Sequence, residues 1–231
     1  MLKNYDELPN FMKNEKVKEY YALLAKKEKS IFIKLCLDKV MATILLLLLA
    51  PVMLFVAYLI KKDSEGPVFF KQKRVTQYGR LYTIYKFRTM VEGADKKGLA
   101  ITGDQDNRVT RLGEVLRKYR IDEIPQLFNV LMGDMTFVGA RPEVLQYVKE
   151  YSNEMKATLL FPAGITSDAS IKYKDETQVL KEHEDLGLDR ETTYIQVILP
   201  AKMDYNLHYL RKFSLRKDIK VLIQTVFAVL K

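Results

Sequence analysis

A run of 21 residues without a charged side chain, residues 40–60, constrains this chain more than any other feature of its sequence. At about 1.5 Å per residue, a straight helix of that length extends about 31 Å, which matches the hydrocarbon thickness of a bilayer. The run follows 39 residues rich in Lys and Glu, and it is longer than the apolar core of a cleavable signal peptide. We therefore expect a helix that stays in the mature protein and enters a membrane.

A proline lies near the middle of this segment. Pro51 follows Ala50, lacks an N–H group and crowds the carbonyl of Leu47, so a kink is expected there. Each arm of a sharply bent helix would be only about 15 Å long, too short to cross a core about 30 Å thick. Lysines flank both ends of the segment, so charge asymmetry gives no clear orientation. Two topologies stay open: a re-entrant hairpin in one leaflet, and a single spanning helix with a proline kink.

Length and composition limit what the rest of the chain can be. The 231 residues suffice for one domain of ordinary size plus an appendage, and 48% hydrophobic residues argue against a disordered chain. A single cysteine, Cys36, excludes an intrachain disulfide, makes a structural zinc site improbable and favours a reducing compartment. The excess of 38 Lys and Arg over 29 Asp and Glu suits an anionic membrane surface or phosphate-bearing ligands.

Three regions follow from these patterns. Residues 1–30 form an N-terminal segment whose spaced apolar positions predict an amphipathic helix, lying on the membrane surface or on the domain. Residues 31–62 hold the membrane helix, and residues 63–231 form the remaining domain. Within that domain, residues 67–90 are rich in β-branched and aromatic side chains around Tyr78-Gly79, which predicts a β-hairpin. From Leu210 onward the pattern predicts an amphipathic helix.

Helix signals surround a pair of acidic residues. Thr110 is a suitable N-cap for a helix that ends near Arg120, and Pro125 fits the first turn of a second helix that ends at Gly133. Asp122-Glu123 therefore lies just before a helix N-terminus, where negative charge is stabilised. From the residue types alone, a capping role is favoured over a catalytic one. The basic residues of the hairpin are likewise compatible with a solvated rim or with phosphate binding.

Several ordered motifs resemble those of the bacterial sugar transferase family, the monotopic polyprenyl-phosphate phosphoglycosyl transferases. The resemblance covers residues 31–231. The motifs that carry it are Lys86-Phe87-Arg88-Thr89-Met90, Leu116-Arg117-Lys118, Asp122-Glu123-Ile124-Pro125-Gln126-Leu127-Phe128-Asn129-Val130-Leu131, Gly133-Asp134-Met135 and Val138-Gly139-Ala140-Arg141-Pro142.

This resemblance implies an α+β, mainly helical fold. It also implies a re-entrant membrane hairpin bent at Ala50-Pro51 and a small catalytic domain on the cytoplasmic face of the bacterial inner membrane. The family usually has Ser where this chain has Ala50, and Pro where it has Ala140. A hydroxyl at the bend would have satisfied freed backbone groups.

The resemblance also implies an activity: transfer of a sugar 1-phosphate from a nucleotide sugar, expected to be a UDP-sugar, to a polyprenyl phosphate. Asp122 is then the nucleophile that forms a covalent phospho-sugar intermediate. Glu123 is a metal ligand or manages a proton, and both acids are candidate ligands of Mg²⁺. The expected phosphate or substrate-binding residues are Arg117, Arg141, Arg88, Lys86 and Gln126.

Two rival functions remain at this point, a nucleic-acid binder and a non-catalytic domain on a single spanning anchor. The basic residues are scattered among turns without a nucleic-acid recognition motif, and a nucleic-acid binder leaves Asp122-Glu123 without a role. The membrane topology of the apolar segment distinguishes the second rival. We therefore expect a lipid and a nucleotide sugar as partners, and no nucleic acid. The sequence leaves the oligomeric state open, a homo-oligomer included.

Overall fold

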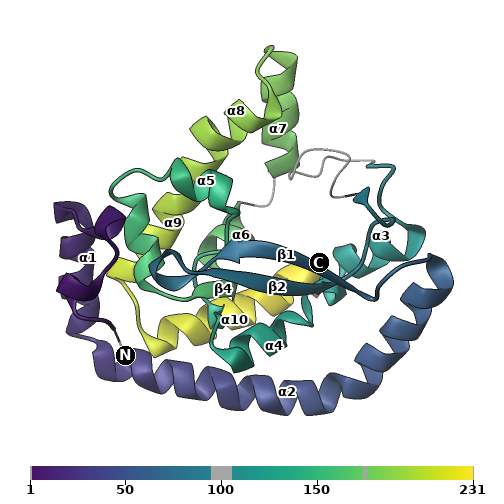
Figure 1. Cartoon of the computed structure of the whole chain (residues 1–231), viewed down its shortest axis with the longest axis horizontal. Helices are drawn as coiled ribbons and strands as arrows, with labels where there is room; N and C mark the ends of the chain where they lie inside the picture. The colour runs from purple at the N-terminus through teal and green to yellow at the C-terminus, as the bar shows by residue number, and fades with distance from the viewer. Residues whose placement is uncertain (1, 95–105, 174–175, 231) are drawn as a thin grey trace.

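The computed structural model describes residues 2–94, 106–173 and 176–230, and within them the fold is mainly helical with two small sheets (Figure 1). Strands β1 and β2 pair antiparallel, and β3 and β4 pair parallel. The elements are α1 (Glu15–Ala25), α2 (Glu28–Asp63), β1 (Phe69–Val75), β2 (Leu81–Phe87), α3 (Arg111–Lys118), α4 (Gln126–Met132), β3 (Met135–Val138), α5 (Leu145–Lys149), β4 (Ala163–Thr166), α6 (Asp168–Lys172), α7 (Glu176–Asp185), α8 (Arg190–Thr193), α9 (Leu199–Arg211) and α10 (Leu215–Leu230). A π-helical turn, Tyr194–Ile198, joins α8 to α9.

The predicted apolar segment lies inside α2, a helix of 36 residues that continues through Pro51. In Figure 1 this helix runs along one side of the domain and curves around its edge. The expected bend thus takes the form of curvature in an unbroken helix, without a loop between two arms. The re-entrant path through a leaflet stays a prediction.

One face of α2 packs on the domain and the other is exposed. Its most apolar window is only 17% buried, which distinguishes it from the core helix of a soluble protein. Leu47, Leu48 and Leu54 each keep at least 68% of their surface exposed. A continuous apolar surface of this size marks contact with a membrane or a partner. The helix is therefore a candidate membrane anchor.

A buried group of charges fixes the N-terminal half of α2 to the domain. The Lys34 ammonium is 2% exposed and lies 2.9 Å from both the Asp38 and the Asp218 carboxylates. Asp218 comes from α10, and Thr136 of β3 donates its hydroxyl to Asp38. Removing one member of such a buried group leaves an uncompensated charge, which is strongly destabilising. The anchor is thus part of the folded core of the domain.

The predicted β-hairpin is confirmed. Phe69 pairs with Phe87 and Val75 with Leu81, and the chain reverses through residues 77–79. Tyr78 and Gly79 both adopt positive φ there, at 59° and 75°. Tyr82, Ile84 and Phe87 turn into the core at 4% exposure or less. The alternating burial of β2 therefore gives the hairpin one packed face.

The helix signals around the acidic pair are also confirmed. The Thr110 hydroxyl accepts from the amide of Gly113 at 3.0 Å, which caps α3. A 3₁₀ turn, Ile121–Glu123, follows, and α4 begins one residue after Pro125. Gly133 ends α4 in the left-handed conformation at φ 80°. The acidic pair thus lies in a rigid turn held between two capped helices.

The amphipathic N-terminal segment lies on the domain, which is one of the two positions expected for it. Val17, Tyr20 and Leu24 of α1 are at most 2% exposed and belong to the main core. The Tyr20 hydroxyl donates to the Glu154 carboxylate at 2.7 Å. This segment therefore packs on the 3₁₀ turn Met155–Leu160 and on α9.

The helix predicted from Leu210 begins later than expected. Leu210 belongs to α9, the chain leaves the helix at Lys212, and α10 starts at Leu215. The hydroxyl of Ser214 accepts from the amide of Lys217, as an N-cap does. This local cap interrupts an apolar pattern that otherwise reads as one helix.

Candidate active site

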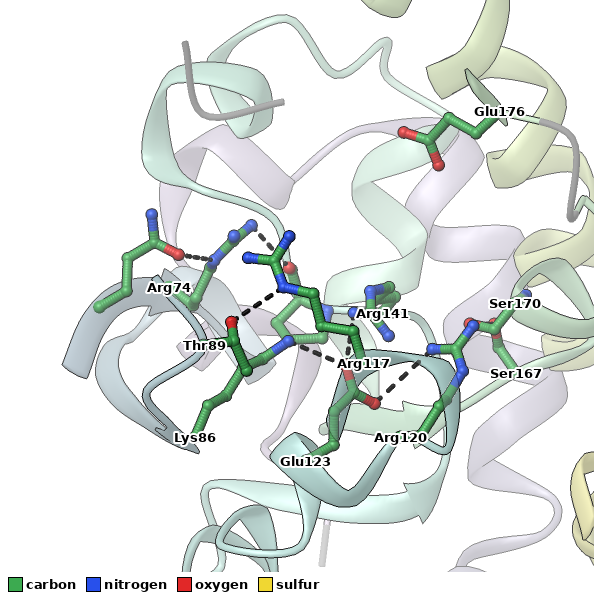
Figure 2. Close-up of polar contacts among 12 residues, drawn as sticks. Arg74, Lys86, Thr89, Arg117, Arg120, Glu123, Arg141, Ser167, Ser170 and Glu176 are labelled. Carbon is green, nitrogen blue, oxygen red and sulfur yellow. Dashed lines mark hydrogen bonds and ion pairs between the residues drawn. The ribbon is translucent and has the colours of Figure 1, made fainter. Parts of the chain in front are cut away.

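Glu123 is the centre of a cluster of cations (Figure 2). Its Oε1 atom lies 2.7 Å from Arg141 Nη2 and 2.8 Å from Lys86 Nζ, and its Oε2 atom lies 3.7 Å from Arg120 Nη1. Burial alone would raise the pKa of Glu123, but the charges of Arg141, Lys86 and Arg120 outweigh it and hold the pKa well below its usual value. Glu123 is therefore ionised and committed to these partners.

Asp122 has a different environment from its neighbour. It is 9% exposed and, among the described residues, forms no hydrogen bond or ion pair. Burial raises the pKa of Asp122, with the charge of Glu123 acting in the same direction and those of Lys86 and Arg117 opposing it. Adjacent carboxylates with pKa values pushed apart are typical of sites where two acids have different tasks. The uncommitted oxygens of Asp122 are the ones available for reaction.

Arg117 reaches the site from the last turn of α3. Its Nε donates to the Thr89 hydroxyl at 2.8 Å, which orients the guanidinium plane (Figure 2). This arrangement needs a close approach between α3 and the segment after β2. A Cβ on Gly113 would lie 2.1 Å from the Thr89 carbonyl oxygen, so only glycine fits there. Thr89 therefore both positions Arg117 and restricts the residue at 113.

Arg120 is a site residue that the sequence reasoning missed. It follows α3 in the left-handed conformation, with φ 53°, which is uncommon for a residue with a side chain. The side chain is 46% exposed, and its polar contact within the described part of the chain is the 3.7 Å approach to Glu123. A backbone outlier beside reactive groups is the kind of strain that functional sites retain. The only sequence signal was its place between a helix end and the acidic pair.

A buried amide ties the acidic turn to the hairpin. Asn129 of α4 is fully buried; its Nδ2 donates to the Thr83 carbonyl at 2.8 Å and its Oδ1 accepts from the Tyr85 amide at 3.1 Å. These two hydrogen bonds satisfy backbone groups on the edge of β2 that has no neighbouring strand. They fix α4 against the strand that carries Lys86. The spacing between the acidic pair and Lys86 thus depends on Asn129.

A cleft of about 630 Å³ opens beside this cluster. Three predicted site residues line it: Arg117, Glu123 and Arg141. The apolar part of the wall includes Leu45 and Leu49 of the anchor helix α2. Asp122 does not line the cleft, whereas the adjacent Glu123 does. The cleft is also lined by Ser170, Glu176, Lys202 and Asn206, which are not among the predicted site residues.

Like Asp122, the predicted site residues Lys86, Gln126 and Arg88 do not line the cleft. Gln126 opens α4 and is 2% exposed. Arg88 donates to the carbonyl oxygens of Glu65 at 2.5 Å, of Ser64 at 2.7 Å and of Ile60 at 3.4 Å. These groups form the C-terminal end of α2, where a cation also suits the helix dipole. A Cβ on Gly66 would meet this guanidinium at 2.1 Å. Arg88 therefore fastens the end of the anchor helix to the motif that carries Lys86.

The acidic pair fits only part of a metal site. Among the described residues, no group of three or more His, Cys, Asp or Glu side chains is placed to hold a metal ion. Mg²⁺, however, is often held by one or two carboxylates together with substrate phosphates and water. Asp122 has free oxygens for such a role, whereas Glu123 already faces three cations. The residues thus fit a Mg²⁺ ion that substrate phosphates help to bind.

The cleft combines several cationic side chains with an apolar wall from α2, which is a candidate membrane anchor. Comparison with known proteins identifies the class of protein. Residues 29–231 match the bacterial sugar transferase family, and the chain belongs to this family.

The alignments with named relatives cover most of this chain. A UDP-N-acetylgalactosamine-undecaprenyl-phosphate N-acetylgalactosaminephosphotransferase of Aeromonas hydrophila is 36% identical over 202 residues, covering 86% of this chain and 44% of the relative. A UDP-glucose:undecaprenyl-phosphate glucose-1-phosphate transferase of Escherichia coli is 34% identical over 194 residues, covering 82% of this chain and 38% of the relative. A protein of the same name from Caulobacter vibrioides is 34% identical, covering 85% of this chain and 69% of the relative. The chain spans less than half the length of the first two.

Proposed function

We propose that this protein transfers a sugar 1-phosphate from a UDP-sugar to a polyprenyl phosphate, through a covalent intermediate on Asp122. The observation that carries the proposal is that the two carboxylates of the acidic pair have different partners. Glu123 is neutralised by Arg141 and Lys86, while the neighbouring Asp122 carboxylate keeps its oxygens free. Family membership and the names of the relatives support the same reaction class.

The chemistry proceeds in two displacements. An Asp122 oxygen attacks the phosphorus next to the sugar, and the bond from that phosphorus to the bridging oxygen breaks, so that UMP leaves with the electron pair. In the second step an oxygen of the lipid phosphate attacks the same phosphorus and the Asp122 carboxylate departs. This relay means that the two anionic substrates need not be bound at the reacting centre together.

The charges of the site suit these two displacement steps. Lys86, Arg117, Arg120 and Arg141 are four cations against two carboxylates, which leaves a formal excess of two positive charges for the phosphates. Arg117 and Arg120 are the least committed of the four. Arg117 donates to the neutral Thr89 hydroxyl, and Arg120 approaches Glu123 only to 3.7 Å. Guanidinium groups bind phosphate oxygens through two N–H groups at once. A bound Mg²⁺ would supply further charge stabilisation.

The proposed location is the cytoplasmic face of the bacterial inner membrane, with α2 as a re-entrant anchor. The exposed apolar face of α2 supports membrane insertion, and its curvature through Pro51 is compatible with a return to the same face. Leu45 and Leu49 line the cleft, so the prenyl chain of the acceptor can remain in lipid while its phosphate reaches the cations. Such an enzyme would start the assembly of a surface glycan.

Trapping the intermediate tests the proposal. The purified protein is incubated with a UDP-sugar and Mg²⁺ in the absence of lipid acceptor, and intact-mass and peptide mass spectrometry are recorded after rapid quenching. We expect UMP release and a mass increase of one sugar phosphate, located on the peptide that contains Asp122. An unmodified protein under conditions where added polyprenyl phosphate gives full turnover would show direct transfer instead.

A further inference from the structure

One buried polar side chain in the cleft has no adequate partner. Asn206 of α9 is 4% exposed and lines the cleft. Among the described residues, its only side-chain hydrogen bond runs from Nδ2 to the Met203 thioether at 3.7 Å, and its Oδ1 accepts none. A thioether is a weak acceptor. Asn206 Oδ1 is not among the fully buried unpaired atoms of the described residues, so it is open to the cleft, where a ligand can complete its hydrogen bonding.

A serine hydroxyl lies on the neighbouring helix. Ser170 belongs to α6, which packs against α9, and it lines the same cleft. Its Oγ is 3.0 Å from Ser167 Oγ, which leaves it further hydrogen-bonding capacity. Figure 2 draws Ser170 and Arg120, both cleft residues, on the same side of the site. The α6–α9 wall, defined here by Ser170 and Asn206, thus offers uncharged donors and acceptors.

The cleft is divided by chemistry into three parts. Arg117, Arg120 and Arg141 supply cations, and Leu45 and Leu49 supply an apolar surface from the anchor helix. The α6–α9 wall presents Ser170 and Asn206 as uncharged polar groups beside the apolar side chains of Ala169, Ile171 and Met203. Lys202 on α9 pairs with Glu176 and so contributes no unpaired charge. Phosphates suit the first part and a prenyl chain suits the second. The third part suits a ligand group that is rich in hydroxyls or amides and carries no charge.

We infer that the α6–α9 wall binds the sugar of the donor, with Asn206 and Ser170 contacting its hydroxyl or acetamido substituents. This inference rests on the proposed function. The sugar is bonded to the phosphorus that Asp122 attacks, so it must lie within the cleft beside the phosphate-binding cations. A side-chain amide and a hydroxyl each donate and accept, and a site that bonds a sugar hydroxyl in this way discriminates against analogues that lack it. Asn206 and Ser170 are therefore specificity-determining residues.

The test compares donors in the full-length enzyme. Rates of UMP release are measured with UDP-glucose and with UDP-N-acetylgalactosamine for the unaltered protein, Asn206→Leu and Ser170→Ala, together with inhibition by UMP. Asp204→Asn is the matched control, because Asp204 is an exposed residue of the same helix and does not line the cleft. We expect each cleft variant to raise KM for the preferred donor roughly 2- to 10-fold and to change the ratio of kcat/KM between the two donors, with UMP inhibition unchanged.

The outcomes separate this inference from the function on which it rests. If the unaltered enzyme releases no UMP from any UDP-sugar, the proposed function fails. If it does so and both cleft variants match the control in donor ratio, the sugar does not bind this wall. Weaker UMP inhibition in the variants would place the nucleoside there and would also overturn the inference. Ser170→Ala keeps the test valid if Asn206→Leu lowers the melting temperature.

Discussion

The guanidinium of Arg141 lies 2.7 Å from the carboxylate of Glu123 and forms no ion pair with the adjacent Asp122. Burial reinforces this pairing, because Glu123 is 7% exposed and Lys86 approaches the same oxygen. Arg141 gains from it too, since the charge of Glu123 raises its pKa. One member of the acidic pair thus organises the cations, which leaves the other for chemistry.

Replacing Asp122 by Asn should abolish turnover with little effect on folding. The variant removes the nucleophile, so we expect kcat to fall by at least about 10³-fold. Because burial raises the pKa of Asp122, the neutral amide relieves a desolvation cost, and stability should stay within about 1 kcal/mol of the unaltered protein. UMP release and thermal unfolding measure the two effects. Glu114→Gln, in the exposed first turn of α3, is the matched control; a substantial residual rate in Asp122→Asn would contradict the assignment.

Replacing Glu123 by Gln should cost stability as well as activity. The change leaves Lys86, Arg141 and Arg120 without their anion, and the loss of a buried partner of this kind is worth roughly 2–4 kcal/mol. Denaturant unfolding at pH 7 measures the loss. A variant as stable as the unaltered protein would show that the cations do not depend on Glu123.

The stabilisation by Glu123 should depend on pH in a defined direction. Its folded-state pKa is lowered below the usual 4.5, so the stabilisation is fully present above that pH and is lost as the pH falls through the lowered value. The difference in unfolding free energy between the unaltered protein and Glu123→Gln should therefore be constant near neutrality and shrink below about pH 4.5. A difference that grows on acidification would refute the assigned direction.

Arg88→Met should loosen the end of the anchor helix. The guanidinium bonds three carbonyl oxygens at Ile60, Ser64 and Glu65, so its removal should cost roughly 2–3 kcal/mol. Because Thr89 and Lys86 lie on the same segment, kcat should fall along with stability. If Arg88 instead binds donor phosphate, as the family resemblance implies, KM for the donor rises while the melting temperature is unchanged. Arg88→Lys, which keeps the charge without the fork, should recover only part of the stability.

Cysteine labelling can decide whether α2 spans the membrane or returns to the face from which it enters. Cys36 is the single native cysteine and is exposed, so it is first replaced by Ser. Single cysteines are then placed at position 29, before the apolar run, and at position 63, after it. A re-entrant helix makes both sites react with an impermeant maleimide from the cytoplasmic side in inverted vesicles. Reaction of one site from each side would establish a spanning helix.

Local features of the fold were predictable from sequence because they depend on neighbouring residues. The turn at Tyr78-Gly79, the Thr110 cap and the Gly133 helix end each need only a few adjacent positions. The acidic pair was also found, but the ion pairs of Glu123 were not, because its partners Lys86 and Arg141 lie 37 and 18 residues away in the sequence.

Contacts between distant segments explain what the sequence did not reveal. Arg88 belongs to a motif that suggested phosphate binding. Its partners are backbone carbonyl groups, which every residue has, so the sequence does not indicate them. Asn206 lies in an ordinary helical pattern. Its burial without a strong hydrogen-bond partner is evident only from the packing of α6 against α9. The parallel pairing of β3 with β4 likewise joins segments separated by a long connection.

The burial of Lys34 against Asp218, together with the place of Leu45 and Leu49 in the cleft wall, affects how this protein can be handled. A truncation that begins after residue 63 would remove Leu45 and Leu49 from the cleft wall and would leave the buried Asp218 carboxylate without its Lys34 partner. Soluble fragments are therefore poor targets for screening or crystallisation. The choice of detergent or nanodisc to replace the bilayer is therefore part of the assay conditions, because it covers the exposed side of the same helix.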